Sequence, residues 1–323
     1  MDLSVMLDNL TSPVILFFLL GAAATIVRSD LAVPPAIARG LSIYLLMAIG
    51  LHGGVELARS GLTAHIAIVL AVAILGSILT PLLAFWVLRF KLDTTNAAAI
   101  AACYGSISAV TFITACSFLE ARGLTFGGYM VAAMALMESP AIVVGVLLAR
   151  MSSPRTDNES LPWGRLGHEA FLNSAVLLLL GSLVIGYLAG DEGWAKVEPM
   201  MYEPFYGLLC VFLLDMGLIA AQRLRELGRS GPFLIAFAIA MPLVQGLMGI
   251  TISWFLGFDT GDTLLMAILW GSASYIAVPA AIRLALPEAN ASLYLPLSLG
   301  VTFPFNIAIG IPFYLWIIES FLQ

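Results

Sequence analysis

Long apolar runs separated by short polar clusters make up nearly the whole chain. A helix needs about 20 apolar residues to cross the roughly 30 Å hydrocarbon core of a bilayer. Runs of about that length recur from one end of the sequence to the other. The pattern predicts an all-α membrane protein with ten transmembrane helices, over residues 13–28, 33–51, 64–88, 95–120, 126–150, 171–189, 203–222, 232–257, 262–286 and 292–322.

Composition supports the membrane class. Of 323 residues, 61% are apolar and 11% are charged, whereas a soluble domain has about a quarter charged residues. The opening MDLSVMLDNLTSP contains no Lys or Arg, so it lacks the basic region of a cleavable signal peptide, and we expect the first span to be retained. No basic cluster predicts a nucleic-acid partner, and the three histidines form no metal-binding pattern. We therefore expect no cofactor and no transition metal.

Lysine and arginine concentrate on one side of the predicted topology. Loops that follow odd-numbered spans carry eleven of these residues, and the opposite side carries only Arg59, Arg122 and Lys196. Short cytoplasmic loops are enriched in Lys and Arg. Both termini are therefore predicted to lie outside the cell, and the polar interval 151–168 is predicted to be a cytoplasmic linker.

This linker divides the chain into two halves of five spans, residues 1–150 and 169–323. Because five is odd, the second half enters the membrane upside down relative to the first. Three features recur in register: GSIS at 105 and GSAS at 271, Gly50 and Gly217 at predicted span ends, and Pro140 and Pro304 within fifth spans. Their separations of 166, 167 and 164 residues predict a 5+5 inverted-topology repeat.

GSIS and GSAS interrupt two predicted spans near their middle. Glycine and serine at this depth favour a helix break that leaves backbone N–H and C=O groups unpaired. In an inverted repeat two broken helices would cross, and their half-helix N-termini suit a small anion. The alternative is that these small residues only let helices pack closely. We expect anion ligands at Gly105, Ser106, Ser108 and Gly271, and Na⁺ ligands at Ser272 and Ser274.

Polar residues elsewhere in the spans add candidates. Glu138 lies in the fifth span, where a carboxylate is costly, and it can neutralise Na⁺, carry a proton or serve only as a hydrogen-bonded structural group. Thr302 and Asn306 flank Pro304 in the tenth span as candidate anion ligands. For Asn306 the alternative is an amide bond between helices. Asp215 is a weaker candidate, because it can pair with a loop arginine.

Three stretches carry a family resemblance: SDLAVPPAIARGLSIYLLMAIGLHGG, GSISAVTF and GSASYIAVPAAIRLALPEANASLYLPLSLGVTFPFNIAIGIPFY. Together they resemble the cyanobacterial-type sodium-dependent bicarbonate transporter family. The resemblance implies Na⁺-coupled bicarbonate uptake by a homotrimer in the bacterial inner (plasma) membrane. It also implies a PII-like regulatory protein on the cytoplasmic face, where 151–168 and 223–231 are candidate contacts. Its anion site matches Ser106, Ser108, Ser272, Ser274, Thr302, Phe303 and Asn306.

The expected function is therefore Na⁺-coupled symport of bicarbonate by alternating access. The sequence leaves open a symporter for another small anion or carboxylate. The sequence also leaves open the alternative of a Na⁺/H⁺ antiporter, although the small number of carboxylates within the predicted spans argues against it. We do not expect an enzyme, because there is no GxSxG stretch and no buried His pairs with the serines.

Overall fold

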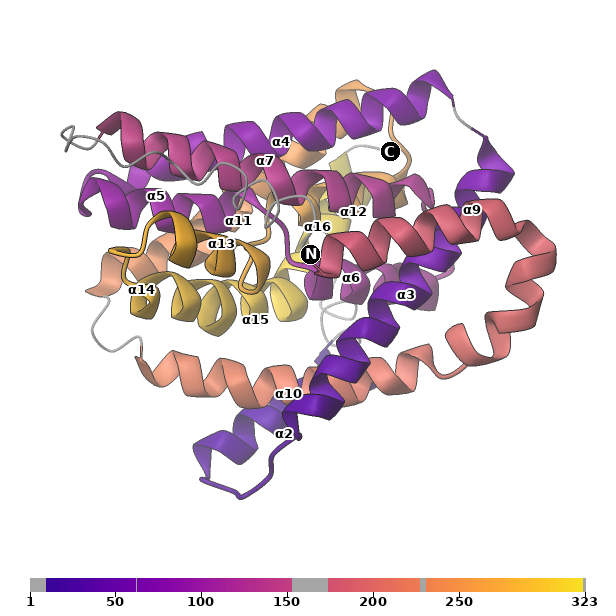
Figure 1. Cartoon of the computed structure of the whole chain (residues 1–323), viewed down its shortest axis with the longest axis horizontal. Helices are drawn as coiled ribbons and strands as arrows, with labels where there is room; N and C mark the ends of the chain where they lie inside the picture. The colour runs from indigo at the N-terminus through magenta and orange to yellow at the C-terminus, as the bar shows by residue number, and fades with distance from the viewer. Residues whose placement is uncertain (1–9, 62, 153–173, 227–230, 322–323) are drawn as a thin grey trace.

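The computed structural model describes residues 10–61, 63–152, 174–226 and 231–321, and the regular structure within these ranges is helical (Figure 1). The first half contains α2 (Pro13–Ile26), α3 (Pro35–Ser60), α4 (Ala64–Leu88), α5 (Thr94–Gly105), α6 (Ala109–Ala121) and α7 (Tyr129–Ser152). The second half begins with α9 (Ser174–Met201), α10 (Phe205–Glu226), α11 (Gly231–Phe255), α12 (Thr260–Trp270) and α13 (Ala277–Ala285). It ends in one irregular run made of α14 (Ala291–Leu295), the π-helical η2 (Pro296–Thr302), α15 (Phe303–Phe305), the π-helical η3 (Asn306–Gly310) and α16 (Ile311–Phe321).

Eight helical stretches in the described part are long and apolar enough to cross a membrane. They are Pro35–Arg59, Ala64–Leu88, Thr94–Ala121, Tyr129–Ala149, Ser174–Met201, Phe205–Arg225, Gly231–Phe255 and Ala291–Ser320. Two shorter apolar helices, Pro13–Ile26 and Thr260–Trp270, fall on the first predicted span and on the first part of the ninth. The apolar, all-helical class is confirmed, and the count of ten spans stays a prediction.

The predicted end of the second span is wrong. The second span was expected to end at residue 51, but α3 continues to Ser60, so Gly50 lies inside the helix. Gly50 and Gly54 lie against the α9 backbone, where a Cβ would meet the carbonyls of Leu179 and Leu183. These glycines therefore serve close helix packing and do not end the helix. The sixth span was expected to end at residue 189, and α9 leaves helical geometry at the next residue, Gly190, before a second helical part runs on to Met201.

Two closely packed helix pairs, α2 with α10 and α3 with α9, form a frame beside the other helices. Figure 1 shows α2 and α10 along one edge and α4 with α7 along the opposite edge. Gly21 lies against Leu214 of α10, and Gly217 lies against Phe18 of α2, in each case so closely that a Cβ would clash with a backbone carbonyl. Small residues thus bring both pairs into backbone contact, as is common between membrane helices.

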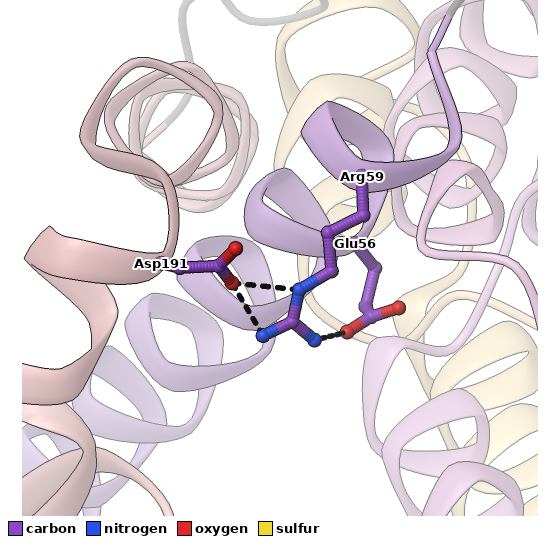
Figure 2. Close-up of polar contacts among 3 residues, drawn as sticks. All are labelled: Glu56, Arg59 and Asp191. Carbon is purple, nitrogen blue, oxygen red and sulfur yellow. Dashed lines mark hydrogen bonds and ion pairs between the residues drawn. The ribbon is translucent and has the colours of Figure 1, made fainter.

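An ion-pair cluster marks the kink of α9 (Figure 2). Arg59, near the end of α3, donates from Nε to Asp191 Oδ1 at 2.7 Å and also contacts Glu56. Asp191 follows Gly190, whose φ of 57° lies in the left-handed region that favours glycine. All three side chains are partly exposed to solvent, so the cluster adds little stability and mainly marks where α9 turns.

The N-termini of the two interrupted helices are tied to opposite halves of the chain. At the start of α5, Asn96 Oδ1 accepts a hydrogen bond from the backbone N–H of Asn290, just before α14. At the start of α12, Asp262 Oδ1 accepts one from Gly127, just before α7. Asn96 and Asp262 are 166 residues apart, and their partners are 163 apart. The two interrupted helices therefore make similar contacts, at a separation close to that of GSIS and GSAS.

Part of the predicted linker and some of the predicted cytoplasmic arginines lie outside the described residues. Of 151–168, only 151–152 are described, at the end of α7. Residues 227–230 of the second candidate loop are likewise outside. The same holds for Arg155, Arg165 and Arg229.

Candidate functional site

The two predicted helix breaks are present, and they bond to each other. Residues 106–108 separate α5 from α6, and residues 271–276 separate α12 from α13. The backbone N–H of Ser108 donates to Ser272 Oγ at 3.0 Å, and the N–H of Ser274 donates to the Cys103 carbonyl at 2.8 Å. Unwound backbone is costly at membrane depth unless its polar groups find partners. Ser272 of the second break supplies such a partner to Ser108, and Cys103 in the last turn of α5 supplies one to Ser274.

Prolines on two neighbouring helices lie against the breaks. Pro81 of α4 is so close to Gly105 that a Cβ there would clash with its ring, and Gly271 similarly lies against the Pro242 carbonyl of α11. Because a proline has no N–H, Pro242 leaves the carbonyl of Ala238 without its helical donor. Thr302 supplies that donor, from Oγ1 to Ala238 O at 2.7 Å. The glycines of both motifs are thus needed for close backbone approach.

The hydroxyl of Ser108, at the start of the second half-helix, makes three hydrogen bonds, and its side chain lines the cavity described below. Ser108 Oγ accepts hydrogen bonds from the Thr111 N–H at 3.2 Å and the Thr111 hydroxyl at 2.8 Å, so it caps α6. It also donates toward the hydroxyl of Tyr275, 3.4 Å away. At the start of α13, Ser274 Oγ accepts from the Val278 N–H at 3.3 Å. α6 thus begins directly after a GSxS serine, whereas α13 begins at Ala277, three residues after Ser274.

A cavity of about 1060 Å³ opens beside these N-termini, between the frame pair α3/α9 and helices α6, α7 and α13. Ser108, Ser274 and Tyr275 line it near the breaks. Arg39 and Ser174, near the first residues of α3 and α9, line it at the other end. Glu138 is buried and also lines the cavity. The cavity thus extends from the breaks toward the first turns of α3 and α9.

Three buried oxygens close to the breaks have no hydrogen-bond partner: Ser106 Oγ, Gln245 Oε1 and Asn306 Oδ1. The amide nitrogen of Asn306 donates to the Gly271 carbonyl at 2.8 Å, and that of Gln245 donates to the Tyr104 carbonyl at 3.2 Å. These bonds fix the direction of both amide groups, and each amide oxygen is left without a hydrogen-bond partner. An unsatisfied buried acceptor costs about 1–3 kcal/mol, so these oxygens suit a positively charged ligand.

The structure brings only part of the predicted site to the cavity. Ser108, Ser274 and Glu138 line it, whereas Ser272 is occupied by the Ser108 N–H. Thr302 bridges Ala238 and the Tyr104 hydroxyl, 2.7 Å away. The remaining predicted ligands are buried beside the breaks or in the π-helical run without lining the cavity, namely Gly105, Ser106, Gly271, Phe303 and Asn306.

Sequence reasoning missed two residues of this site. Tyr275, directly after the second GSxS motif, lines the cavity, and its ring lies edge-on to Phe303 at 5.6 Å between centroids. Gln245 is a fully buried amide in a helix of mostly apolar residues. A polar side chain at that depth is itself a signal of function, and this signal identifies Gln245 from the sequence alone.

A helical membrane protein in which two broken helices meet beside a cavity has the build of a secondary transporter. The sequence profile of the Na⁺-dependent bicarbonate transporter superfamily matches residues 13–319, and the chain belongs to that superfamily. This confirms the resemblance read from the three stretches. The protein is thus a multi-pass membrane transporter, and its family implies bicarbonate and Na⁺ as substrates. A search of curated proteins found no match.

Proposed function

We propose that the protein takes up bicarbonate together with Na⁺ by alternating access. The observation that carries this proposal is the pair of hydrogen bonds between the two breaks, which places the starts of α6 and α13 beside one cavity. A helix N-terminus carries about half a positive charge on unpaired N–H groups, which favours an anion. Two of them beside one cavity suit a small anion without a buried lysine or arginine.

In this proposal the anion binds at the cavity end of the breaks. The hydroxyls of Ser108 and Tyr275 lie there, and the long 3.4 Å bond between them would be exchanged for bonds to the anion, with Ser274 on the same wall. Bicarbonate has both an O–H donor and acceptor oxygens, and a hydroxyl side chain can serve either. The sequence assigned Ser274 to Na⁺, and the cavity lining favours the anion for this residue.

Sodium binds at the opposite ends of the broken helices in this proposal. The C-termini of α5 and α12 carry the negative ends of their helix dipoles. The unpartnered oxygens of Ser106 and Asn306 lie by these ends. The sequence led us to expect that Asn306 binds the anion, and we now propose that it binds Na⁺ instead. The anion then faces N-termini and the cation faces C-termini of the same two breaks.

The cavity is proposed to represent the inward-facing state. It follows the first halves of α3, α6 and α9, whereas further along these helices His52, Glu120 and Trp194 surround a space of only about 30 Å³. The rings of His52 and Trp194 are 5.2 Å apart and help to close that side. Movement of α4–α7 and α11–α16 against the frame α2, α3, α9 and α10 would open the two sides in turn.

The inverted repeat of ten spans is proposed on the paired contacts of the two halves. The Asn96 and Asp262 ties connect each broken helix to the other half in the same way. The two frame pairs are also related in this way. Gly21 of α2 lies against α10, and Gly186 of α9, 165 residues further along the chain, lies against α3. The homotrimer, the PII-like regulator, and the cytoplasmic side of the linker stay predictions from the sequence.

The test is uptake of radiolabelled bicarbonate into proteoliposomes with Na⁺ or K⁺ outside. We expect uptake only with Na⁺, and a fall of about tenfold or more in Ser108→Ala, because a hydrogen bond to a charged group is worth about 1.5–3 kcal/mol. Ser77→Ala is the matched control, since the hydroxyl of this buried serine donates within its own helix, to Ile74 O at 2.9 Å. Equal uptake with K⁺ by folded protein would refute Na⁺ coupling. A pH change driven by Na⁺ without bicarbonate would support antiport.

A further inference from the structure

The cavity is larger and more apolar than a small hydrated anion requires. Its volume of about 1060 Å³ is at the upper end of the range of about 300–1,000 Å³ that holds drug-sized ligands. Between the breaks and the far end, its walls are formed mainly by aliphatic side chains, among them Leu46, Ile113 and Met134. A bicarbonate ion would contact only a small part of this apolar surface.

Large apolar side chains also line the cavity where it reaches the protein surface. Ile43 of α3 is 45% exposed, and Leu177 and Ile185 of α9 are each 59% exposed. Ile276, before α13, is 59% exposed on the facing wall. In a membrane protein, exposed aliphatic side chains favour contact with lipid tails over water. The opening between α3/α9 and α13 therefore faces hydrocarbon.

One cation is present among the described residues that line the cavity, and it is Arg39. It lies in the second turn of α3, is exposed, and forms no hydrogen bond or ion pair with another described residue. Arginine pairs with phosphate through two parallel hydrogen bonds. A basic side chain at the end of a membrane helix, beside an apolar slot open to lipid, matches the two parts of a phospholipid.

We propose that this cavity binds a membrane phospholipid, with one acyl chain inside it and the phosphate on Arg39. The chain enters between α3/α9 and α13 and lies along Leu46, Ile113 and Met134. In this position it occupies the route from Ser108 and Ser274 to the far end. A bound lipid therefore blocks release of the transported anion until the chain leaves the cavity. The proposal concerns binding, and it stands whether or not the transported anion is bicarbonate.

The test uses phosphatidylcholine vesicles that contain the full-length protein and a small fraction of phosphatidylglycerol with a photoactivatable group on its acyl chain. After illumination, labelled residues are mapped by mass spectrometry. We expect label on the inner wall, at Leu46, Ile113 or Met134. Label confined to the outer surface, for example at Leu188, which is 77% exposed, would overturn the proposal. The readout is a covalent bond, so a failure of the proposed transport function would not affect it.

Two pairs of variants give the result its specificity. Gly181 lines the cavity and a Cβ there meets nothing within 4 Å, so Gly181→Trp fills the cavity without a backbone clash. Gly207 is equally open and lies outside the cavity lining, which makes Gly207→Trp the control. We expect inner-wall label to be nearly lost in the first and unchanged in the second. Gly181→Leu repeats the test with a smaller side chain if the tryptophan variant does not fold.

The head-group contact is tested by Arg39→Gln against Arg28→Gln, an exposed arginine in the neighbouring loop outside the lining. We expect a loss of inner-wall label of about fivefold for Arg39→Gln only, the effect of one basic residue near a charged membrane surface. Equal label in the two variants would refute the role of Arg39. A photoactivatable fatty acid is the second arm. If the fatty acid labels the inner wall and the phospholipid does not, the cavity binds a fatty acid and the proposal of a phospholipid is wrong.

Discussion

At the scale of single residues, Thr302 and Asn306 show that one buried polar side chain can serve the fold while its neighbour keeps an atom available for a ligand. Both flank Pro304, and both are expected from the sequence to be anion ligands. In the structure the Thr302 hydroxyl is used twice, toward Ala238 and Tyr104. Asn306 uses its nitrogen on Gly271 and keeps an unpartnered oxygen. Only the second residue has capacity left for a ligand.

Thr302→Val should therefore lower stability without changing the bicarbonate KM. The variant leaves the carbonyl of Ala238 without a donor, which costs about 1–3 kcal/mol, and we expect a lower unfolding temperature in detergent. Thr251→Val is the control, because this exposed threonine bonds only its own helix, to Leu247 O. A raised KM at unchanged stability would instead make Thr302 a substrate ligand.

Asn306→Ala should weaken Na⁺ binding. Removing the unpartnered oxygen takes away a proposed ligand, so the Na⁺ concentration for half-maximal uptake should rise by about tenfold, for an interaction of about 1.4 kcal/mol. Titration of uptake with Na⁺ at fixed bicarbonate measures this shift, with Ser77→Ala beside it as the control. The outcome against the proposal is an unchanged Na⁺ dependence with a raised KM for bicarbonate.

At the scale of elements, glycines decide how closely the frame helices approach. A Cβ on Gly217 would meet the Phe18 carbonyl of α2, and neither backbone can move away without separating α2 from α10. Gly217→Ala should therefore destabilise the protein by about 1–3 kcal/mol or more, as overpacking does. Gly40→Ala is the matched control, since a Cβ there meets nothing within 4 Å. Thermal unfolding of both variants measures the difference, and equal stabilities would contradict the close packing.

At the scale of the whole molecule, the cavity and the closed side lie along the same helix. Ser42 lines the large cavity, and Ile49, two turns further along α3, is buried against the small space near His52. In the inward-facing state with no acyl chain in the cavity, Ser42→Cys should react with a membrane-impermeant maleimide from the cytoplasmic side, and Ile49→Cys should resist it from both sides. The three native cysteines are buried, so they add little background. Reaction of Ile49→Cys in the absence of substrate would show that the other side is open.

The sequence by itself determined the helical membrane class, the two breaks at GSIS and GSAS, and the family. These follow from local properties, because the length of an apolar run and the backbone preferences of Gly, Ser and Pro need no distant partner. The tertiary structure decided that α3 continues through Gly50 and Gly54, since these glycines lie against α9.

It also decided which buried polar atoms are satisfied. The side chains of Thr302 and Asn306 and the backbone N–H of Ser108 bond to partners that lie 35 to 198 residues away along the chain. A hydrogen bond over such a separation exists only once the helices have packed, so no local pattern could tell the used oxygens from the free ones.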